Sequence, residues 1–531
     1  MNSSVKWWIA LGLVLALGSV FRFAGLHLRP MHTDEAVHGV KFGYLLEDGF
    51  YKYNPNQFHG PTLNYLTLIP AWLTGTHQIE KVSEQLLRIV PAVFGIGIII
   101  LVFFLRDRNT PTAIFWSVVF AALSPAMVFY SRYYIQETLL VFFVFGLIVF
   151  GYRYLCNRRL IWIILAGICA GLAFATKETS VIAFASIAVS AVVVYLIPNR
   201  QKAAANKTQK IKPLHIIYAL IAAIGISALF FSSFGSNISG ITDSVKIFEP
   251  YLLRAGQSPK HIHPWYYYFQ ILLFWHEGAG PIWNELVIVI PAIAGCFLSF
   301  FGNVPGDRRF RQFIAVYIVV MAAVYAAIPY KTPWCMLGFL QPMTLMAGLA
   351  VAWCFSKITA RFKPLLFILA AAGCAYLGYL TLMSNFRYYD HPANPYTYSH
   401  PTGDVFKIDE KLDDLARASD RPLIVRVIYP DHEYWPLPWY FRDLPKTGWH
   451  SEVTDKIGDA DIIIADLRLR PPITEVLYEH RVPGQRNLYV PAFAQWQRLR
   501  PGARVQMYVR ATLWQRMRQI PLRAGSAIEN D

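Results

Sequence analysis

Charged residues are scarce in this sequence of 531 residues. They make up 15% of the chain, whereas a soluble domain carries roughly 25%. Hydrophobic residues make up 55%, and apolar runs close to the roughly 20 residues that cross a bilayer recur as far as about residue 384. The low charge and the repeated apolar runs exclude an ordinary soluble protein and indicate a polytopic α-helical membrane protein.

Several common motifs are also absent. No glycine-rich phosphate-binding motif stands between a strand and a helix, so neither a Walker nor a dinucleotide-binding fold is favoured. The six cysteines lie in or near apolar runs, which implies no disulfide framework. The net charge of +16 is concentrated in short loops between these runs, where it indicates membrane topology and not a nucleic-acid partner.

The apolar runs predict about eleven transmembrane helices. The first follows Lys6 and lacks a convincing cleavage site, so we expect a retained helix and not a signal peptide. The runs lie near residues 6–25, 86–105, 113–131, 136–155, 160–176, 179–197, 214–233, 283–302, 312–329, 334–356 and 364–383.

Basic residues are concentrated in alternate loops. Because such loops stay in the cytoplasm, we expect an inner (plasma) membrane protein with a cytoplasmic N-terminus and an extracytoplasmic C-terminal segment. The basic residues of these loops are Arg106, Arg108, Arg153, Arg158, Arg159, Arg200, Lys202, Lys207, Lys210, Lys212, Arg308, Arg309, Arg311, Lys357, Arg361 and Lys363.

The composition changes near residue 385. We therefore predict a transmembrane domain over 1–384 and a soluble extracytoplasmic α/β domain over 385–531. The C-terminal domain has strand-like runs at 423–429, 461–465 and 504–509 and a helical pattern at 405–418. Two long outside loops are expected, at 26–85 and 234–282, and the first contains interfacial helices at 36–46 and 61–73.

The motif His32-Thr-Asp-Glu35 follows the first apolar run. A carboxylate outside the bilayer can take a proton from an acceptor hydroxyl without the desolvation cost of a buried anion. Asp34 and Glu35 are thus candidate catalytic residues. The competing interpretation is that both acids only cap the helix that follows, since acidic residues suit the first turn of a helix.

Three short outside connections carry further charges. Arg132 and Glu137 lie in the first, Lys177 and Glu178 in the second, and Lys331 in the third. The three cations could hold a phosphate group, because Arg offers a planar fork and Lys a point charge. The alternatives are solvated hairpins between helices and basic anchors that reach lipid phosphates.

Histidines are frequent in the predicted outside loops. His32, His38 and His59, with Glu178, are candidates for orienting an acceptor or a metal ion. Asp34, His263 and Glu277 could take part in a metal site, but the spacing matches no strong metal motif and favours ordinary polar or interface histidines. A divalent cation could bridge a phosphate to a carboxylate, although the sequence does not require one.

These residues resemble the GT-C superfamily of membrane glycosyltransferases. The resemblance covers essentially the whole chain and is to the branch that contains protein O-mannosyltransferases and lipid A aminoarabinose transferases. Within it, the sequence looks most like a prokaryotic flippase-associated family linked to archaeal protein glycosylation. The motifs that carry this finer likeness are His32-Thr-Asp-Glu-Ala-Val-His38, His59-Gly-Pro61, Tyr330-Lys-Thr-Pro-Trp334 and Tyr434-Trp-Pro-Leu-Pro-Trp-Tyr440.

The resemblance implies an inverting transfer of sugar from a polyprenyl-phosphate donor to a protein, lipid or glycan acceptor outside the membrane. It implies that Asp34 is the base, that Glu137 supports the site and that Lys331 helps to hold the donor phosphate. Two alternatives stay open, a lipid-linked sugar flippase or transporter and a non-catalytic subunit of a glycosylation assembly. The ionisable residues gather at the outer ends of the spans and not at their centres, which favours surface chemistry over transport.

Overall fold

The chain forms two compact units. The computed structural model describes residues 3–55, 59–106, 109–198, 211–248, 261–479 and 487–520. The first unit consists of Met1–Leu28, Lys41–Tyr389 and Ala393–Tyr398, and the second of Arg29–Val40, Asp390–Pro392 and Ser399–Asp531. Some basic residues of the orientation argument lie outside the described residues, namely Arg108, Arg200, Lys202, Lys207 and Lys210.

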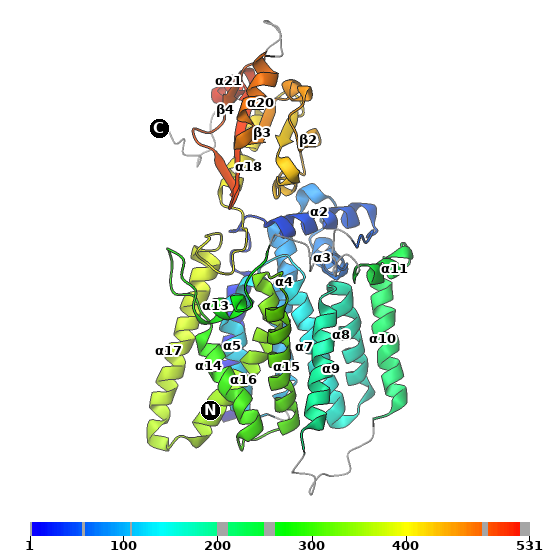
Figure 1. Cartoon of the computed structure of the whole chain (residues 1–531), viewed down its shortest axis with the longest axis vertical. Helices are drawn as coiled ribbons and strands as arrows, with labels where there is room; N and C mark the ends of the chain where they lie inside the picture. Colours follow the sequence, from blue (N-terminus) through cyan, green and yellow to red (C-terminus); the bar gives the residue numbers. More distant parts are fainter. Residues whose placement is uncertain are drawn as a thin grey trace. The chain divides into compact units, whose positions relative to one another are not determined.

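The first unit is a bundle of apolar helices (Figure 1). Among the described residues, seven helices are long and apolar enough to cross a membrane. Each coincides with a run expected from hydropathy, so a multi-pass helical membrane protein is confirmed. These helices are α1 (Ser3–Phe23), α4 (Glu84–Phe103), α7 (Glu137–Asn157), α10 (Pro213–Phe231), α15 (Arg308–Ala327), α16 (Leu337–Lys357) and α17 (Lys363–Leu382).

Three shorter apolar helices lie at further predicted positions: α8 (Leu160–Thr176), α9 (Ser180–Leu196) and α14 (Leu286–Phe301). Helix α8 packs closely on α10 because Gly167 and Gly171 of α8 face the backbone of α10. A Cβ atom on either glycine would lie 2.3 Å from a carbonyl oxygen of α10. This is the approach of small residues on which helix packing in membranes depends.

The run over 113–131, which was expected to form one helix, forms two helices in the structure. It divides into α5 (Pro111–Leu123) and α6 (Pro125–Ser131), which meet at 58°. Pro125 has no N–H to continue the first helix, and it holds Ser124 outside helical geometry. The Arg22 guanidinium donates to the carbonyls of Ala121 and Ala122 at 2.9 and 3.1 Å, so the exposed end of α5 is satisfied.

The first long loop is helical, as expected. It contains α2 (Thr33–Asp48) and α3 (Thr62–Leu73), which match the predictions at 36–46 and 61–73. Helix α2 belongs to both compact units, because the boundary falls between Val40 and Lys41. The second long loop contains α11 (Ser239–Lys246) and α13 (Tyr267–Leu273).

The second unit is an α/β domain, which confirms the predicted class. Parallel β1 (Val425–Ile428), β2 (Thr447–His450) and β3 (Ile462–Asp466) are joined by antiparallel β6 (Ala503–Arg510), in the order β2-β1-β3-β6-β4. The unit also contains β4 (Tyr489–Pro491), β5 (Gln497–Arg500), which pairs with β6, and the helices α18 (Asp404–Arg417), α19 (Leu437–Tyr440), α20 (Arg470–Thr474) and α21 (Ala511–Gln519). Every residue of β3 is buried, as is typical of a central strand.

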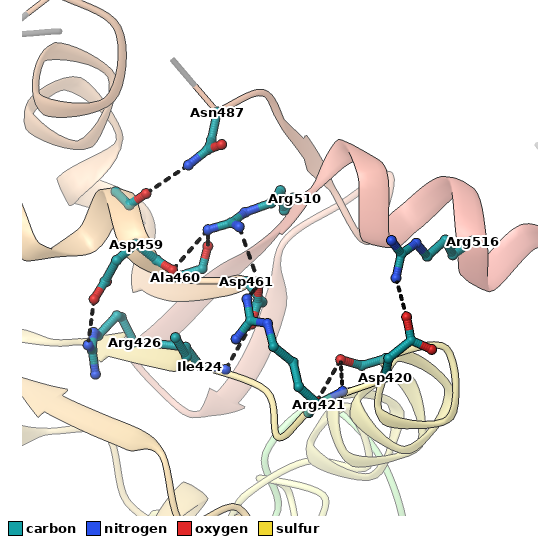
Figure 2. A network of polar contacts seen from close by, with 12 residues as sticks. Asp420, Arg421, Ile424, Arg426, Asp459, Ala460, Asp461, Asn487, Arg510 and Arg516 are labelled. Carbon is teal, nitrogen blue, oxygen red and sulfur yellow. Dashed lines mark hydrogen bonds and ion pairs between the residues drawn. The ribbon is translucent and has the colours of Figure 1, made fainter. Parts of the chain in front are cut away.

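A polar network holds the amino ends of β1 and β3 together (Figure 2). The buried Asp461 carboxylate accepts the Ile424 N–H at 3.0 Å and an N–H of Arg421 at 2.8 Å. Arg510 lies 3.6 Å from the same carboxylate and donates to the Ala460 carbonyl at 2.8 Å. These side chains bond to one another, so this edge of the sheet has a structural role.

Candidate functional site

The start of α2 carries the two adjacent carboxylates. The Glu35 carboxylate accepts the backbone N–H of His32 at 3.0 Å, and His32 Nδ1 accepts the backbone N–H of Asp34 at 3.0 Å. The arrangement is similar to a capping box, except that a histidine replaces the usual hydroxyl residue and bonds to the N–H of Asp34 and not of Glu35. Glu35 is completely buried and also lies 3.9 Å from Arg29. Its observed role is therefore to hold the first turn of the helix.

Asp34 has different surroundings. Its side chain is 45% exposed, and the carboxylate lies 3.8 Å from His32 Nδ1. That nitrogen already accepts a hydrogen bond from the backbone, so the proton of a neutral His32 sits on Nε2. Helix capping thus uses Glu35, while the Asp34 carboxylate is open to a reactant. His38 lies one turn further along α2 and is buried.

A second group of predicted residues meets in the first unit. Lys177 and Glu137 form an ion pair, although Glu137 begins α7 and Lys177 follows the end of α8. Both side chains are almost completely buried. Burial alone lowers the pKa of Lys177, but the adjacent Glu137 carboxylate more than offsets this and raises it above the usual value. Lys177 is therefore a fixed cation at this position.

The motif His59-Gly-Pro61 lies beside this pair. His59 Nδ1 is 2.8 Å from a carboxylate oxygen of Glu178, whose side chain is buried. Gly60 explains the close approach, because a Cβ atom there would lie 2.1 Å from the Ala175 carbonyl oxygen. The structure therefore brings together four predicted residues from three connections, namely His59, Glu137, Lys177 and Glu178.

An apolar pocket adjoins Glu137. It lies among α7, α9, α15 and α16, and Glu137 and Thr179 are among its polar members. The other lining residues are Leu140, Val141, Val144, Phe145, Ile148, Ala183, Tyr317, Met321, Tyr325, Trp334, Cys335, Gly338 and Gln341. A buried ion pair beside an apolar pocket offers both halves of what an amphipathic ligand needs.

Arg132 has a structural role that the sequence did not suggest. Its guanidinium donates to the carbonyls of Phe21 at 2.8 Å, Ala24 at 2.5 Å and Gly25 at 3.0 Å. These carbonyls lie at the C-terminal end of α1, where no intrahelical donor is available. Phosphate binding by Arg132 would require some of these bonds to break, and that role stays a prediction.

Lys331 lies in a different cluster of the first unit. Its ammonium group donates to the carbonyls of Ile328 and, at 3.2 Å, His263. The His263 ring stacks on Tyr267, and its Nε2 is 3.3 Å from the Tyr398 hydroxyl. Burial and the neighbouring His261 and Lys331 lower the pKa of His263, which favours a neutral ring.

Potential metal ligands are dispersed. Within the described part of the chain, no three His, Cys, Asp or Glu side chains are grouped so that they could hold a metal ion. The candidates Asp34, His263 and Glu277 therefore form no such group, and Glu277 is exposed.

The fold is similar to that of solved structures of ArnT. ArnT from Cupriavidus metallidurans, in the apo state, aligns with a TM-score of 0.64 at 11% identity over 96% of this chain and 99% of its own. The same protein bound to undecaprenyl phosphate aligns with a TM-score of 0.60 at 13% identity over 95% and 98%. This chain has the GT-C fold.

A structure with a lower TM-score also agrees with the GT-C fold. The oligosaccharyltransferase AglB from Archaeoglobus fulgidus, in complex with an inhibitory peptide and a dolichol-phosphate, aligns with a TM-score of 0.54 at 11% identity over 88% of this chain and 70% of its own. A family described as dolichyl-phosphate-mannose-protein mannosyltransferase matches residues 67–230. No curated protein sequence matches the chain. The likeness to the flippase-associated family stays a prediction.

Sequence reasoning missed residues that act from far along the chain. Arg500, in β5, donates to the Thr33 hydroxyl at 3.2 Å, and the Tyr440 hydroxyl accepts the Met31 N–H at 2.8 Å. No local pattern marks Arg500, because it is one of many arginines in its domain and its partner lies 467 residues earlier. Tyr440 ends the aromatic motif 434–440, which was considered only as evidence of a family likeness.

Proposed function

We propose that this chain is a membrane glycosyltransferase that moves a sugar from a polyprenyl-phosphate donor to an acceptor hydroxyl outside the membrane. The observation that carries the proposal is the difference between the two adjacent carboxylates at the start of α2. Glu35 is buried in the helix cap, whereas Asp34 is half exposed. The GT-C fold supports the reaction class, since ArnT and AglB, both similar to this chain, have structures with a prenyl-type phosphate bound.

In the proposed reaction, Asp34 accepts the proton of the acceptor hydroxyl. The hydroxyl oxygen forms a bond with the anomeric carbon, and the bond from that carbon to the phosphate oxygen breaks. The polyprenyl phosphate leaves as an anion with the bonding electrons. A single displacement of this kind inverts the anomeric centre, and a positioned base contributes roughly 10²- to 10⁴-fold to such a step.

Cations are needed for the phosphate group of the donor. We assign this role first to Lys177, because it is a buried and permanently charged group beside an apolar pocket. Glu137 keeps the ammonium group in place. Lys331 is the second candidate, and Arg132 is the weakest because it caps α1.

The acceptor side is assigned by the same reasoning. His32 fixes the turn that bears Asp34, and His59 with Glu178 forms a polar pair whose ring is partly accessible. We assign His59 and Glu178 to orienting the acceptor or the sugar, together with His38. The proposal covers a protein, lipid or envelope-glycan acceptor and requires no divalent ion.

The test is transfer of radiolabelled sugar in proteoliposomes, from a panel of polyprenyl-phosphate sugars to crude envelope acceptors. We expect the wild type to incorporate label and Asp34→Asn to lose roughly 100-fold or more of the rate. Asp48→Asn removes an exposed carboxylate from the other end of α2 and should retain activity. Thermal unfolding of each variant controls for folding.

Near-normal turnover by Asp34→Asn would contradict the assignment of the base. If no donor gives label but labelled lipid crosses the bilayer, the transporter alternative gains support. If neither transfer nor translocation occurs, a non-catalytic subunit is favoured.

A further inference from the structure

The carboxyl edge of the C-terminal sheet faces the turn that bears Asp34. From β1 the chain crosses first to β2 on one side and then to β3 on the other. In open α/β sheets, ligands bind outside the carboxyl ends of the strands at such a reversal. In this protein the segment Arg29–Val40, which belongs to the same compact unit, contributes residues to that edge.

Arg500 lies at this edge because of its register. Asp466, the last residue of β3, pairs with Val505 of β6, and Arg500 pairs with Ala503 just beyond. The guanidinium forms an ion pair with Glu433 and donates to the carbonyls of Glu433 at 3.3 Å and Trp435 at 3.2 Å. The connection after β1 therefore fixes the direction of the Arg500 side chain.

The remaining contact of Arg500 is with the Asp34 turn. One N–H of the guanidinium donates to the Thr33 hydroxyl at 3.2 Å. Two residues earlier, the Met31 N–H donates to the hydroxyl of Tyr440, and both residues are buried. The backbone before Asp34 is thus held at two points by residues of the C-terminal domain.

We propose that Arg500 is a positioning residue for Asp34 and acts through Thr33. The inference rests on the proposed function, in which Asp34 is the base. The Asp34 side chain is half exposed, so its position depends on the backbone of its turn. A displacement of a reacting group by about 1 Å can cost on the order of 100-fold in rate. In this view the C-terminal domain sets the geometry of the base.

The experiment is a double-mutant cycle in the full-length protein. We expect Arg500→Gln and Thr33→Val each to lower kcat roughly 10-fold, with the KM for the donor unchanged. The double variant should be no slower than the slower single variant, because both changes remove the same contact. Arg500→Lys should recover part of the rate, since it restores one donor and the charge facing Glu433.

The matched control is Arg498→Gln. Arg498 is an exposed arginine two residues earlier in β5 that stacks near Trp496. It should retain both kcat and KM. Hydrogen exchange of the amides of residues 31–36 gives a second readout, and we expect faster exchange in Arg500→Gln and Thr33→Val but not in the control.

The outcomes separate this inference from the proposed function. Faster exchange with an unchanged kcat would overturn the positioning role and leave the transferase intact. Additive losses in the double variant would also overturn it. Absence of transfer by the wild type would overturn the proposed function and the positioning role together, and unchanged exchange in Arg500→Gln would show that Arg500 does not hold the turn.

Discussion

The two adjacent carboxylates in the first turn of α2 have different surroundings. Asp34 and Glu35 are adjacent, so successive positions of a helix point them about 100° apart. The longer side chain of Glu35 reaches back to the N–H of His32, whereas the Asp34 side chain points towards solvent. The helix period and one extra methylene group thus separate the buried capping acid from the half-exposed acid that we propose as the base.

The buried pair of Glu137 and Lys177 gives a prediction at the residue scale. Glu137→Gln or Lys177→Met alone should lower the free energy of unfolding by roughly 3–5 kcal/mol, because each leaves one buried charge unpaired. The double variant should regain most of this loss and yet stay inactive, since Lys177 is assigned to the donor phosphate. Denaturation in detergent and the transfer assay measure the two effects.

The pair of Lys246, which is exposed, and Asp243, which is partly exposed, in α11 is the control for that prediction. Lys246→Met should change stability little, because exposed ion pairs contribute little. Recovery of transfer in the Glu137→Gln/Lys177→Met variant would show that the pair is only structural.

At the scale of elements, close packing between the ends of helices and the loops that join them forms the polar cluster of His59, Glu137, Lys177 and Glu178. The link at His59 and the end of α8 are in contact only because residue 60 is glycine. Gly60→Ala should therefore separate His59 from Glu178 and lower both stability and transfer. Gly151→Ala, in the middle of α7, has open space around the added Cβ and should be neutral or stabilising by up to about 1 kcal/mol. Normal activity in Gly60→Ala would remove the cluster from the mechanism.

The elements themselves could largely be predicted from the sequence. Hydropathy locates helices well, because a span must be long and apolar, and strand-like runs located β1, β3 and β6. The break at Ser124 was missed because Pro125 lies inside an otherwise continuous apolar run. The shorter strands β2, β4 and β5 have too few residues for a clear pattern.

The site could be predicted only in part. Acidic residues in short connections were located because charge is conspicuous next to apolar runs, and four of the named residues meet. The sequence cannot tell a free cation from one that caps a helix, so Arg132 was assigned to phosphate although it satisfies the end of α1. Arg500 depends on a contact over 467 residues, which no local pattern records. The domain boundary at 384/385 stays a prediction.

At the scale of the whole molecule, several predicted cytoplasmic ends share one face of the bundle. The Tyr152 hydroxyl at the end of α7 donates to Asp307, which precedes α15, at 3.2 Å. Arg153 donates to the carbonyl of Phe104, which follows α4, at 3.1 Å. These contacts agree with the alternation of basic loops, which we propose to be cytoplasmic.

Orientation can be measured by cysteine labelling in a variant that lacks the six native cysteines. We expect a membrane-impermeant maleimide to modify Glu277→Cys in intact cells and Arg361→Cys only after permeabilisation. Glu277 is exposed in the second long loop, and Arg361 lies between α16 and α17. The reverse pattern would contradict both the orientation and a reaction outside the membrane.

The long separation of Thr33 from Arg500 has a consequence for biosynthesis. A ribosome releases the turn with Asp34 first, and it must add 467 further residues before the arginine that holds Thr33 exists. Until residue 500 has been synthesised, and in any product that stops before it, the turn that bears Asp34 lacks its contact with Arg500. On the proposed role of Arg500, a truncated protein that lacks this residue would transfer sugar roughly 10-fold more slowly. If Arg500 positions Asp34 as we propose, the turn reaches its full order only after residue 500 has been synthesised.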